Sequence, residues 1–354
     1  MKKICIGVIG CGRIANNAHF PALAKIGEVR VKYACDLIPE KALAAKEKYP
    51  FIEHAVTDYQ TVLRDGEVEA VWVLTPNFAH YTITMEALAA GKHVFCEKPI
   101  TVNYPLSLKM AQKAEECGKI LNIGVCNRFF APVEKLAQMV ADGRFGKVYH
   151  VNCSFCEFRS IPGLGGAFTT KAQSGGGVLI DWGVHFFDLI LYLLGGAKVQ
   201  SVSGASYSEM AKDLTAYRYK KMWAEDTADL LHGTNDVEDY ITGFVRTDKA
   251  SISFNGAWAE NLDRKQMYVD ILGDKGGARY EYLKGFTFTD GATLESQTPE
   301  MESENMYLCE DRAFLESVRT GMKNKSHISE VLETAKLLDA IYRSADIGKE
   351  VTLG

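Results

Sequence analysis

Three side chains in this 354-residue chain have the types and spacing needed to move a proton at an alcohol or a carbonyl group. Lys98 stands in the run HVFCEKPI, directly after an apolar segment, and its positive charge can polarise an oxygen atom. Asp181 and His185 are four residues apart in SGGGVLIDWGVHFFD, so a helix would place them on one face. Histidine titrates near neutrality, which suits removal of the hydroxyl proton when a secondary alcohol is oxidised. We therefore expect Lys98, Asp181 and His185 to be catalytic, with Asp181 binding a substrate hydroxyl.

Each of these motifs also has a structural interpretation when it is taken alone. A Lys-Pro pair is common in surface turns, and an Asp–His pair on a helix is often a hydrogen bond with a structural role. Two polar side chains in an apolar helix need partners, however, which favours a pair that faces a cleft. The chemistry therefore depends on whether other elements bring a cofactor to the same residues.

A second group of residues has the pattern that binds the pyrophosphate of a dinucleotide. Residues 7–15 read GVIGCGRIA, which is G-x-G-x-x-A between an apolar run and a helical segment. The glycines permit a tight turn and a close approach of the backbone, and the helix N-terminus offers N–H groups to the phosphates. The alternative is that the glycines only join a strand to a helix. The predicted cofactor contacts of this loop are Gly10, Gly12, Arg13 and Ile14.

Further cofactor contacts are expected where later strands end. Asp36 follows the second apolar run about 20 residues past the loop, where a carboxylate can bind a ribose hydroxyl. That carboxylate would repel the extra phosphate of NADP, so we expect NAD rather than NADP, unless Asp36 simply caps the next segment. Ligands of an open α/β sheet bind beyond the carboxyl ends of its strands, so the turns there face the cofactor. The residues of these turns are Thr75, Pro76, Asn77, His80, Glu97 and Lys98.

The elements that must position these residues alternate in the first third of the chain. Short apolar runs are expected to be strands and the segments between them helices, in the rhythm of a parallel sheet covered on both faces. The predicted strands are Lys3–Ile9, Val29–Cys35, Ala70–Leu74, His93–Cys96 and Ile120–Val125, and the predicted helices include Ile14–Ile26, Pro39–Lys48, Tyr81–Ala90 and Leu106–Cys117. We predict an α/β fold whose N-terminal domain, residues 1–125, is a doubly wound parallel sheet of the Rossmann type that binds NAD(P).

From Val148 onward the chain changes to longer β-rich segments separated by turn signals. This predicts a C-terminal α+β domain, residues 126–354, built on a mostly antiparallel sheet. One apolar helix, Gly177–Leu194, interrupts the strands, and helices return at Glu304–Thr320 and Ile328–Ile347. We expect these C-terminal helices to pack back near the first domain.

The composition excludes several classes of protein. A net charge of −5 gives no basic face for nucleic acid. No apolar run reaches the ~18 residues of a membrane span, and the glycines of the N-terminal run argue against a signal peptide. The nine cysteines are scattered and the single CxxC, Cys153 and Cys156, lies in a strand-like run, so we expect no metal site and a reducing compartment. We therefore expect a cytoplasmic protein without nucleic-acid or membrane partners.

Taken together and in this order, the motifs resemble the glucose–fructose oxidoreductase / inositol dehydrogenase / rhizopine-catabolism (Gfo/Idh/MocA) family. The resemblance covers nearly the whole chain through GVIGCGRIA, TPNFAHYTITMEALAAGKHVFCEKP, NRFFAP, GGGVLIDWGVHFFD, FNGAW and the C-terminal GKEVTL. It implies that the C-terminal domain supplies a large open sheet for substrate binding and oligomerisation, in a homo-oligomer such as a dimer, tetramer or hexamer. It also implies Lys98 as the catalytic lysine, Asp181 as the substrate-binding acid and His185 as the acid/base. Asn127 and Arg128 match a segment near the substrate pocket of such enzymes.

The resemblance leaves the individual substrate open. We expect an NAD(P)-dependent dehydrogenase or reductase acting on a secondary hydroxyl of a sugar, a glycoside (its 3-hydroxyl included) or a cyclitol. One alternative is a glycoside-processing enzyme that uses tightly bound NAD transiently without net release of NADH, and another is a non-catalytic NAD-binding sensor. Lys171 is expected to bind substrate at the pocket rim. The polar segment 209–237 is expected to be a subunit contact or a surface insertion rather than a lid.

Overall fold

The computed structural model describes residues 2–353. Its contacts divide the chain into two compact units, and neither unit is continuous in sequence. The first unit extends to Thr101 and adds Pro105–Phe129 and Glu304–Leu332, whereas the second comprises Val102–Tyr104, Phe130–Ser303 and the residues from Glu333 onward. The predicted domain boundary after residue 125 stays a prediction, and the compact units divide differently because residues 304–332 cluster with the N-terminal residues.

The first unit is built on a six-stranded parallel sheet in the order β3-β2-β1-β4-β5-β6. Its strands are β1 (Ile4–Ile9), β2 (Val29–Cys35), β3 (His54–Val56), β4 (Ala70–Val73), β5 (His93–Glu97) and β6 (Leu121–Gly124). β1, β4 and β6 are buried along their whole length, as strands covered on both faces must be. The strand order reverses between β1 and β4, which is where an open α/β sheet binds ligands. The predicted Rossmann sheet is confirmed.

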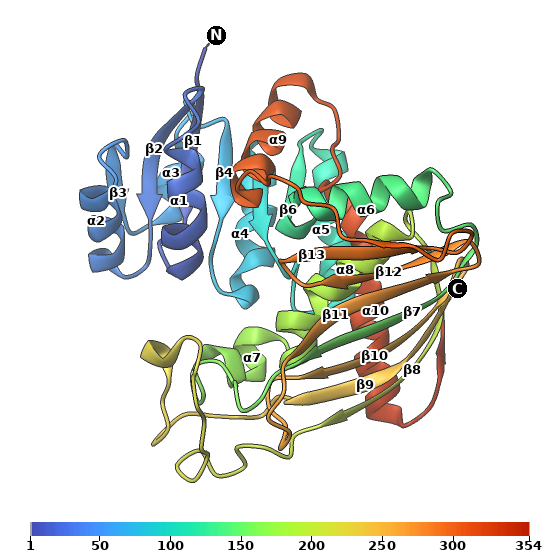
Figure 1. Ribbon diagram of the computed structural model, residues 1–354. Helices are drawn as coiled ribbons and strands as arrows, with labels where there is room; N and C mark the ends of the chain where they lie inside the picture. Colours follow the sequence, from blue (N-terminus) through green and yellow to red (C-terminus); the bar gives the residue numbers. More distant parts are fainter. Residues whose placement is uncertain (1, 354) are drawn as a thin grey trace. The chain divides into compact units, whose positions relative to one another are not determined.

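Helices surround this sheet, and one of them comes from the far end of the sequence. The helical elements are η1 (Ala15–His19), α1 (Phe20–Leu23), α2 (Pro39–Lys48), α3 (Tyr59–Arg64), α4 (Asn77–Ala89), α5 (Tyr104–Glu116), η2 (Cys126–Phe129) and α9 (Met306–Thr320). Figure 1 draws α9 in orange-red among the blue and cyan elements. Its Phe314 is fully buried, and the ring lies 4.9 Å from that of Trp72 in β4. Helix α9 therefore completes the core of the N-terminal unit.

The second unit is built on a nine-stranded sheet in the order β14-β13-β12-β11-β7-β10-β9-β8-β15. Neighbouring strands run antiparallel except β7 and β10, which pair in parallel. The strands are β7 (Val148–Cys156), β8 (Val199–Tyr207), β9 (Tyr240–Thr247), β10 (Ser251–Ala257), β11 (Gln266–Gly273), β12 (Gly276–Glu281), β13 (Gly285–Asp290), β14 (Ser296–Gln297) and β15 (Val351–Thr352). The large, mostly antiparallel sheet that the sequence predicts is confirmed.

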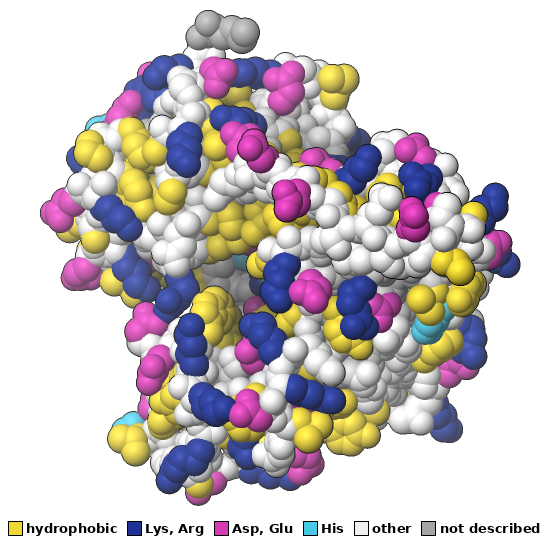
Figure 2. All heavy atoms as spheres, in the orientation of Figure 1, with side chains coloured by type: hydrophobic (Ala, Val, Ile, Leu, Met, Phe, Trp, Pro, Cys, Tyr) yellow, Lys and Arg dark blue, Asp and Glu magenta, His cyan; other side chains and the backbone are white. Residues whose placement is uncertain are grey.

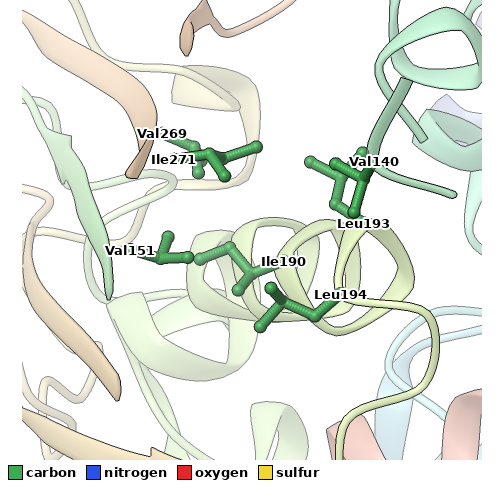
Figure 3. A pocket seen from close by; sticks show the side chains of 7 residues that line it. All are labelled: Val140, Val151, Ile190, Leu193, Leu194, Val269 and Ile271. Carbon is green, nitrogen blue, oxygen red and sulfur yellow. The ribbon is translucent and has the colours of Figure 1, made fainter. Parts of the chain in front are cut away.

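The helices of the second unit lie along one face of this sheet, as Figure 1 shows for α8 and α10. The helical elements are α6 (Ala131–Ala141), η3 (Ala167–Thr169), α7 (Lys171–Ser174), η4 (Leu179–Gly183), α8 (Val184–Leu193), η5 (Glu225–Thr227) and α10 (Ile328–Ile347). In Figure 3, side chains of α8 such as Ile190 point toward Val151 and Ile271 of the sheet. The space that they enclose has no room for a water molecule, so it is packing and not a ligand pocket.

One helical stretch of the second unit, residues 171–193, is long and apolar enough to cross a membrane, judged by length and composition alone. The expectation that the chain has no such stretch is wrong in this respect. The most apolar window of this stretch is 78% buried inside the structure. Burial of that kind is what the central helix of a folded domain requires, because its apolar side chains pack on the sheet.

Candidate active site

The glycine loop joins β1 to the helix that follows, and its two glycines meet different surroundings. Gly10 has a φ of +101°, and a Cβ there would lie 2.5 Å from the carbonyl oxygen of Leu74. Only glycine fits at this position. A Cβ on Gly12 would meet no atom within 4 Å, so open space lies beside the loop. Arg13 is exposed and Ile14 half-buried at the start of the helix, whose first N–H groups have no partner within the helix and suit a phosphate.

Asp36 follows β2 and is tied to the glycine loop. Its carboxylate oxygens accept hydrogen bonds from the N–H groups of Cys11 and Ile38, each at 2.9 Å. A carboxylate offers about four acceptor positions, so two remain. Because Asp36 is only half-buried, the remaining positions suit hydroxyl donors such as those of a ribose. The structure thus brings Asp36 and the loop together as the sequence predicts.

The turn after β4 is linked to the turn after β5 through one histidine. Thr75 and Asn77 are half-buried and Pro76 is exposed. His80 has no exposed surface, and its ring nitrogens lie 2.9 Å from the carbonyl oxygen of Thr75 and 2.8 Å from that of Pro99. Burial lowers the pKa of His80, and a neutral ring donates to one of these carbonyl groups at a time. His80 therefore joins the two turns, and its expected direct contact with the cofactor stays a prediction.

Glu97 and Lys98 end β5 with opposite exposures. Glu97 is 6% exposed, and one of its oxygens accepts the N–H of Lys98 at 2.9 Å. A Cβ on the neighbouring Gly124 would lie 2.8 Å from the Glu97 carboxyl carbon, so the carboxylate fills the space that the glycine leaves. Lys98 is half-buried, and its peptide bond to Pro99 is cis. The carboxylate of Glu97 faces inward and holds the main chain of Lys98, and the expected contact of Glu97 with the cofactor stays a prediction.

Asn127 and Arg128 lie in η2 and are almost completely buried. The Arg128 guanidinium donates to the main-chain carbonyls of Lys325 at 2.6 Å and Glu330 at 3.0 Å. The Lys325 carbonyl lies in the segment before α10 and the Glu330 carbonyl lies in its first turn, and the guanidinium gives both of them a hydrogen-bond donor. A guanidinium used in this way holds the fold of the N-terminal unit, and the expectation that Arg128 binds substrate stays a prediction. For Asn127, 2% exposure leaves little side-chain surface for a ligand.

Asp181 and His185 lie in one continuous helical segment of the second unit. Asp181 is in the π-helical turn η4 and His185 is half-buried in the first turn of α8. π-Helical turns are rare and are frequently found at functional sites, and the glycine loop runs into another one, η1. Asp181 is 9% exposed, and the buried indole N–H of Trp258 donates to its Oδ2 at 3.3 Å. The structure therefore places the predicted pair at the start of a rigid apolar helix and orients the carboxylate.

The glycines before this helix are explained by Glu238, a residue that is 7% exposed and lies between the 209–237 segment and β9. Its carboxylate accepts the N–H groups of Gly177 at 2.9 Å and Leu179 at 3.0 Å, and the Tyr342 hydroxyl at 2.9 Å. A Cβ on Gly177 would lie 1.9 Å from the Glu238 carbonyl oxygen. Burial raises the pKa of Glu238, and the N–H donors oppose that rise. Glu238 thus caps and anchors the helix that carries Asp181.

Lys171 begins α7 and its side chain is exposed. The main-chain N–H of Lys171 donates to Asp236 at 2.6 Å, and the hydroxyl of the fully buried Thr169 donates to the carbonyl of Thr234 at 2.7 Å. The segment 209–237 is therefore packed on the residues around Lys171 within the second unit. It is an ordered insertion that supports this part of the chain, in line with the expected surface insertion.

Four structural residues of the site escaped the sequence analysis: His19, Trp258, Glu238 and Asp311. The signal for them was weak, because a single buried polar residue in an apolar segment does not reveal its partner. His19 and Asp311, for example, bond to each other across 292 residues of sequence. Among residues 2–353, no cluster of His, Cys, Asp and Glu side chains has the arrangement needed to hold a metal ion.

Two family models match most of the chain. Residues 4–125 match the oxidoreductase family with an NAD-binding Rossmann fold (GFO_IDH_MocA), and residues 133–279 match the GFO/IDH/MocA C-terminal domain. The matched ranges contain the glycine loop and the helix with Asp181 and His185.

Individual relatives agree with this match. The chain is 29% identical over 350 residues to the D-glucoside 3-dehydrogenase of Escherichia coli (strain K12), covering 98% of this chain and 97% of the relative. It is 29% identical over 190 residues to the myo-inositol 2-dehydrogenase of Thermotoga maritima, covering 54% of each chain. A solved levoglucosan dehydrogenase in complex with NADH has the same fold, with a TM-score of 0.85, 18% identity and coverage of 100% of both chains.

Proposed function

The chain belongs to the Gfo/Idh/MocA family of NAD-binding oxidoreductases, and from this premise we propose that it oxidises a secondary alcohol carbon of a sugar, glycoside or cyclitol, or reduces the corresponding ketone. The observation that carries the proposal is the match along almost the full length of both chains to a glucoside 3-dehydrogenase. We take the 3-hydroxyl of a glucoside as the first candidate for the reacting group. The relative that acts on myo-inositol keeps a cyclitol as the second candidate.

The residues at the carboxyl edge of the parallel sheet fit a dinucleotide. Open space at Gly12 leaves room for a pyrophosphate beside the backbone, and Asp36 has acceptor positions left for ribose hydroxyls. Thr75 and Asn77, in the turn after β4, would lie toward the nicotinamide half. When bound, nicotinamide supplies the two-electron acceptor or donor for the alcohol carbon.

The chain's own residues would move the proton and stabilise charge. In the oxidation, His185 removes the hydroxyl proton of the substrate, because a neutral imidazole is an effective base near neutral pH. The Lys98 ammonium stabilises the negative charge that develops on the same oxygen. Asp181, held by the Trp258 indole, accepts a hydrogen bond from the reacting or a neighbouring hydroxyl. The reduction uses the same groups in reverse, with His185 returning the proton.

We also propose that NAD is preferred over NADP, and this depends on Asp36. An Asp36→Ala variant loses two acceptor positions and the charge that repels a 2′-phosphate, so its affinity for NAD falls by roughly 10- to 100-fold, the value of a hydrogen bond to a charged group. Its affinity for NADP rises relative to NAD. Fluorescence titration with both cofactors measures the two affinities, and Asp36→Asn is the control that keeps the shape. Unchanged NAD binding in Asp36→Ala would remove the argument.

The setting we propose is a cytoplasmic homo-oligomer. All nine cysteines are free and seven are buried, as in a reducing compartment. The face of the nine-stranded sheet opposite α8 carries small polar residues linked in rows, such as His150 to Ser251 at 2.9 Å and Ser253 to Asn152 at 3.1 Å. A flat surface of this kind can stack on the same face of a second copy. Acidic and basic side chains alternate on the face in Figure 2, which suits a small-molecule substrate better than an extended polyanion.

The deciding experiment is an absorbance assay at the NADH band. Purified protein is given NAD and a panel of sugars, glucosides and inositols, and product formation is followed in the same samples. A rise with one subset, absent in Lys98→Ala, supports the dehydrogenase and identifies the substrate by its hydroxyl pattern. Consumption of a substrate without a rise instead supports transient use of bound NAD, and a panel that stays untouched contradicts the proposal.

A further inference from the structure

A buried group of ionisable side chains lies inside the N-terminal unit, directly behind the turn that carries Lys98. His19, Glu310 and Asp311 have no exposed surface, and Glu97 is 6% exposed. His19 comes from η1, Glu97 from the end of β5, and the other two from α9. The mechanism above uses none of these four as a proton donor or acceptor. Burying so many ionisable groups is costly in free energy unless they are paired, so we expect hydrogen bonds or ion pairs among them.

The hydrogen bonds form a continuous chain from α9 to the main chain of Lys98. The Nδ1 atom of His19 lies 3.0 and 3.3 Å from the two Asp311 oxygens, and its Nε2 lies 3.1 Å from Glu97 Oε1. The other oxygen of Glu97, Oε2, accepts the N–H of Lys98 at 2.9 Å. The Trp72 indole N–H donates to Asp311 at 2.8 Å and fixes the far end. Each link is within hydrogen-bonding distance.

The two carboxylates require His19 to be doubly protonated. Carboxylate oxygens only accept, so an imidazole that bonds one at each nitrogen needs a proton on both. Burial acts to lower the pKa of His19, but the charge of Asp311 and the hydrogen bonds to Asp311 and Glu97 outweigh it and raise the pKa to about 10. The other titratable neighbours are Tyr307, whose ring lies 5.8 Å from His19, and Glu310.

Glu310 adds little negative charge to this group. Neither of its carboxyl oxygens has a hydrogen-bond partner among the described residues. Burial, followed by the charge of Glu97, raises the pKa of Glu310 well above its usual value, which favours the uncharged form of this carboxyl group. The direct partners of the His19 ring are therefore Asp311 and Glu97.

We propose that His19 is a positioning residue for the turn that carries Lys98: as an imidazolium it joins Asp311 to Glu97 and so fixes the main chain at Lys98. The catalytic importance of this turn rests on the function proposed above for Lys98. Glu97 cannot retreat toward β6, because its carboxylate already fills the space beside Gly124. Without the imidazolium, Glu97 is a buried charge lacking its counterion, and its bond to the Lys98 N–H changes with it.

The first test measures protonation in the full-length protein. Histidine side chains are labelled with nitrogen-15, and the His19 signals are assigned as those missing from His19→Gln. The expected result is an imidazolium at pH 8, where an unperturbed histidine is neutral. A neutral His19 ring at pH 8 overturns the proposal.

The second test measures the turn itself, without the need for a substrate. Amide hydrogen exchange is followed at Lys98 in the wild type, in His19→Gln and in His54→Gln, a control at an exposed histidine of the same unit. Loss of one charge-assisted hydrogen bond makes exchange at Lys98 roughly 10- to 100-fold faster in His19→Gln only. Unchanged exchange at Lys98, or an equal increase throughout the N-terminal unit, overturns a positioning role.

A third readout connects the turn to catalysis. On the substrate found in the absorbance assay, His19→Gln lowers kcat on the order of 10²-fold, the effect of a displacement near 1 Å, while KM for NAD changes little. A His19→Gln enzyme with normal kcat overturns the catalytic part of the proposal. If no substrate is turned over by the wild type, the proposed function fails, and the exchange measurement still decides the role of His19.

Discussion

Glu97 and Lys98 are adjacent residues of opposite charge, and the structure gives them separate tasks. The carboxylate of Glu97 points into the buried group around His19, whereas the half-buried Lys98 carries the charge that we propose acts in the reaction. The run EKP at a strand end was enough to predict Lys98 as a candidate. It was not enough to predict the direction of Glu97, because that depends on a glycine in the next strand and a histidine in another helix.

Lys98→Ala tests the role of the ammonium group. The variant keeps the fold and the affinity for NAD, and its kcat falls on the order of 10²- to 10³-fold, the cost of removing one group that stabilises an oxyanion. Isothermal titration with NAD and initial rates on the identified substrate measure the two effects. Lys98→Met, which keeps the length of the side chain, is the control for packing. Normal turnover in either variant would contradict the assigned role.

The two glycines of the loop give a matched pair of substitutions. Gly10→Ala places a Cβ 2.5 Å from a carbonyl oxygen at a φ of +101°, so we expect a loss of about 1–3 kcal/mol in the free energy of unfolding. Gly12→Ala meets open space, so stability is kept while NAD affinity falls about tenfold or more through contact with the pyrophosphate. Denaturant unfolding and NAD titration on both variants check this. Equal effects of the two substitutions would show that the loop does not approach a phosphate.

At the scale of elements, the helix with Asp181 and His185 is held by its N-terminus. Gly177→Ala puts a Cβ 1.9 Å from the Glu238 carbonyl oxygen, so we expect a loss of about 1–3 kcal/mol and a lower kcat as η4 shifts. Gly27→Ala, where a Cβ meets no atom within 4 Å, is the control. Thermal unfolding and initial rates are the measurements. A Gly177→Ala enzyme as stable and active as the control is incompatible with the anchoring role of Glu238.

Prediction from sequence succeeded where one periodic pattern decided the element. Residues 29–35, 39–48 and 328–347 have the predicted bounds. The helix after the glycine loop ends at Leu23 rather than Ile26, and β3 with its three residues was missed because so short a run carries no period. The strand β13 was also missed, although Phe286 and Phe288 alternate with polar residues as a strand requires. The strand-end and helix positions of Asp36, Lys98, Asp181 and His185 followed from local sequence, but their partners came from tertiary contacts.

At the scale of the whole molecule, three histidines predict how stability depends on pH. Burial lowers the pKa of His93 and His327 to about 4, and each accepts a main-chain N–H at Nδ1. In the unfolded chain they bind protons below pH ~6.5, so stability falls as the pH drops from about 6.5 toward 4. His19 has the opposite sign: its folded pKa of about 10 stabilises the fold below pH ~6.5, and this contribution is lost as the pH rises toward 10.

The melting temperature should therefore be highest near pH 6–7, by the same linkage. Differential scanning calorimetry from pH 4 to pH 10 measures the profile. His19→Gln flattens the alkaline slope and His327→Asn flattens part of the acid slope, whereas His54→Gln changes neither. If the melting temperature of His19→Gln still falls as the pH rises from 7 to 10, a group other than His19 causes the loss of stability.

Because α9 belongs to the N-terminal unit, the core of that unit can be completed only after residues 306–320 have been synthesised. Asp311 is made 292 residues after His19. At a synthesis rate of ~5–20 residues per second, His19 therefore waits roughly 15–60 s for the helix that supplies Asp311. During this interval Trp72 and His19 have no Asp311 to bond, and the site of Phe314 in the core is empty. The nascent chain must be protected at that apolar surface until residues 306–320 have been made, so this unit matures later than the position of its sheet in the sequence suggests.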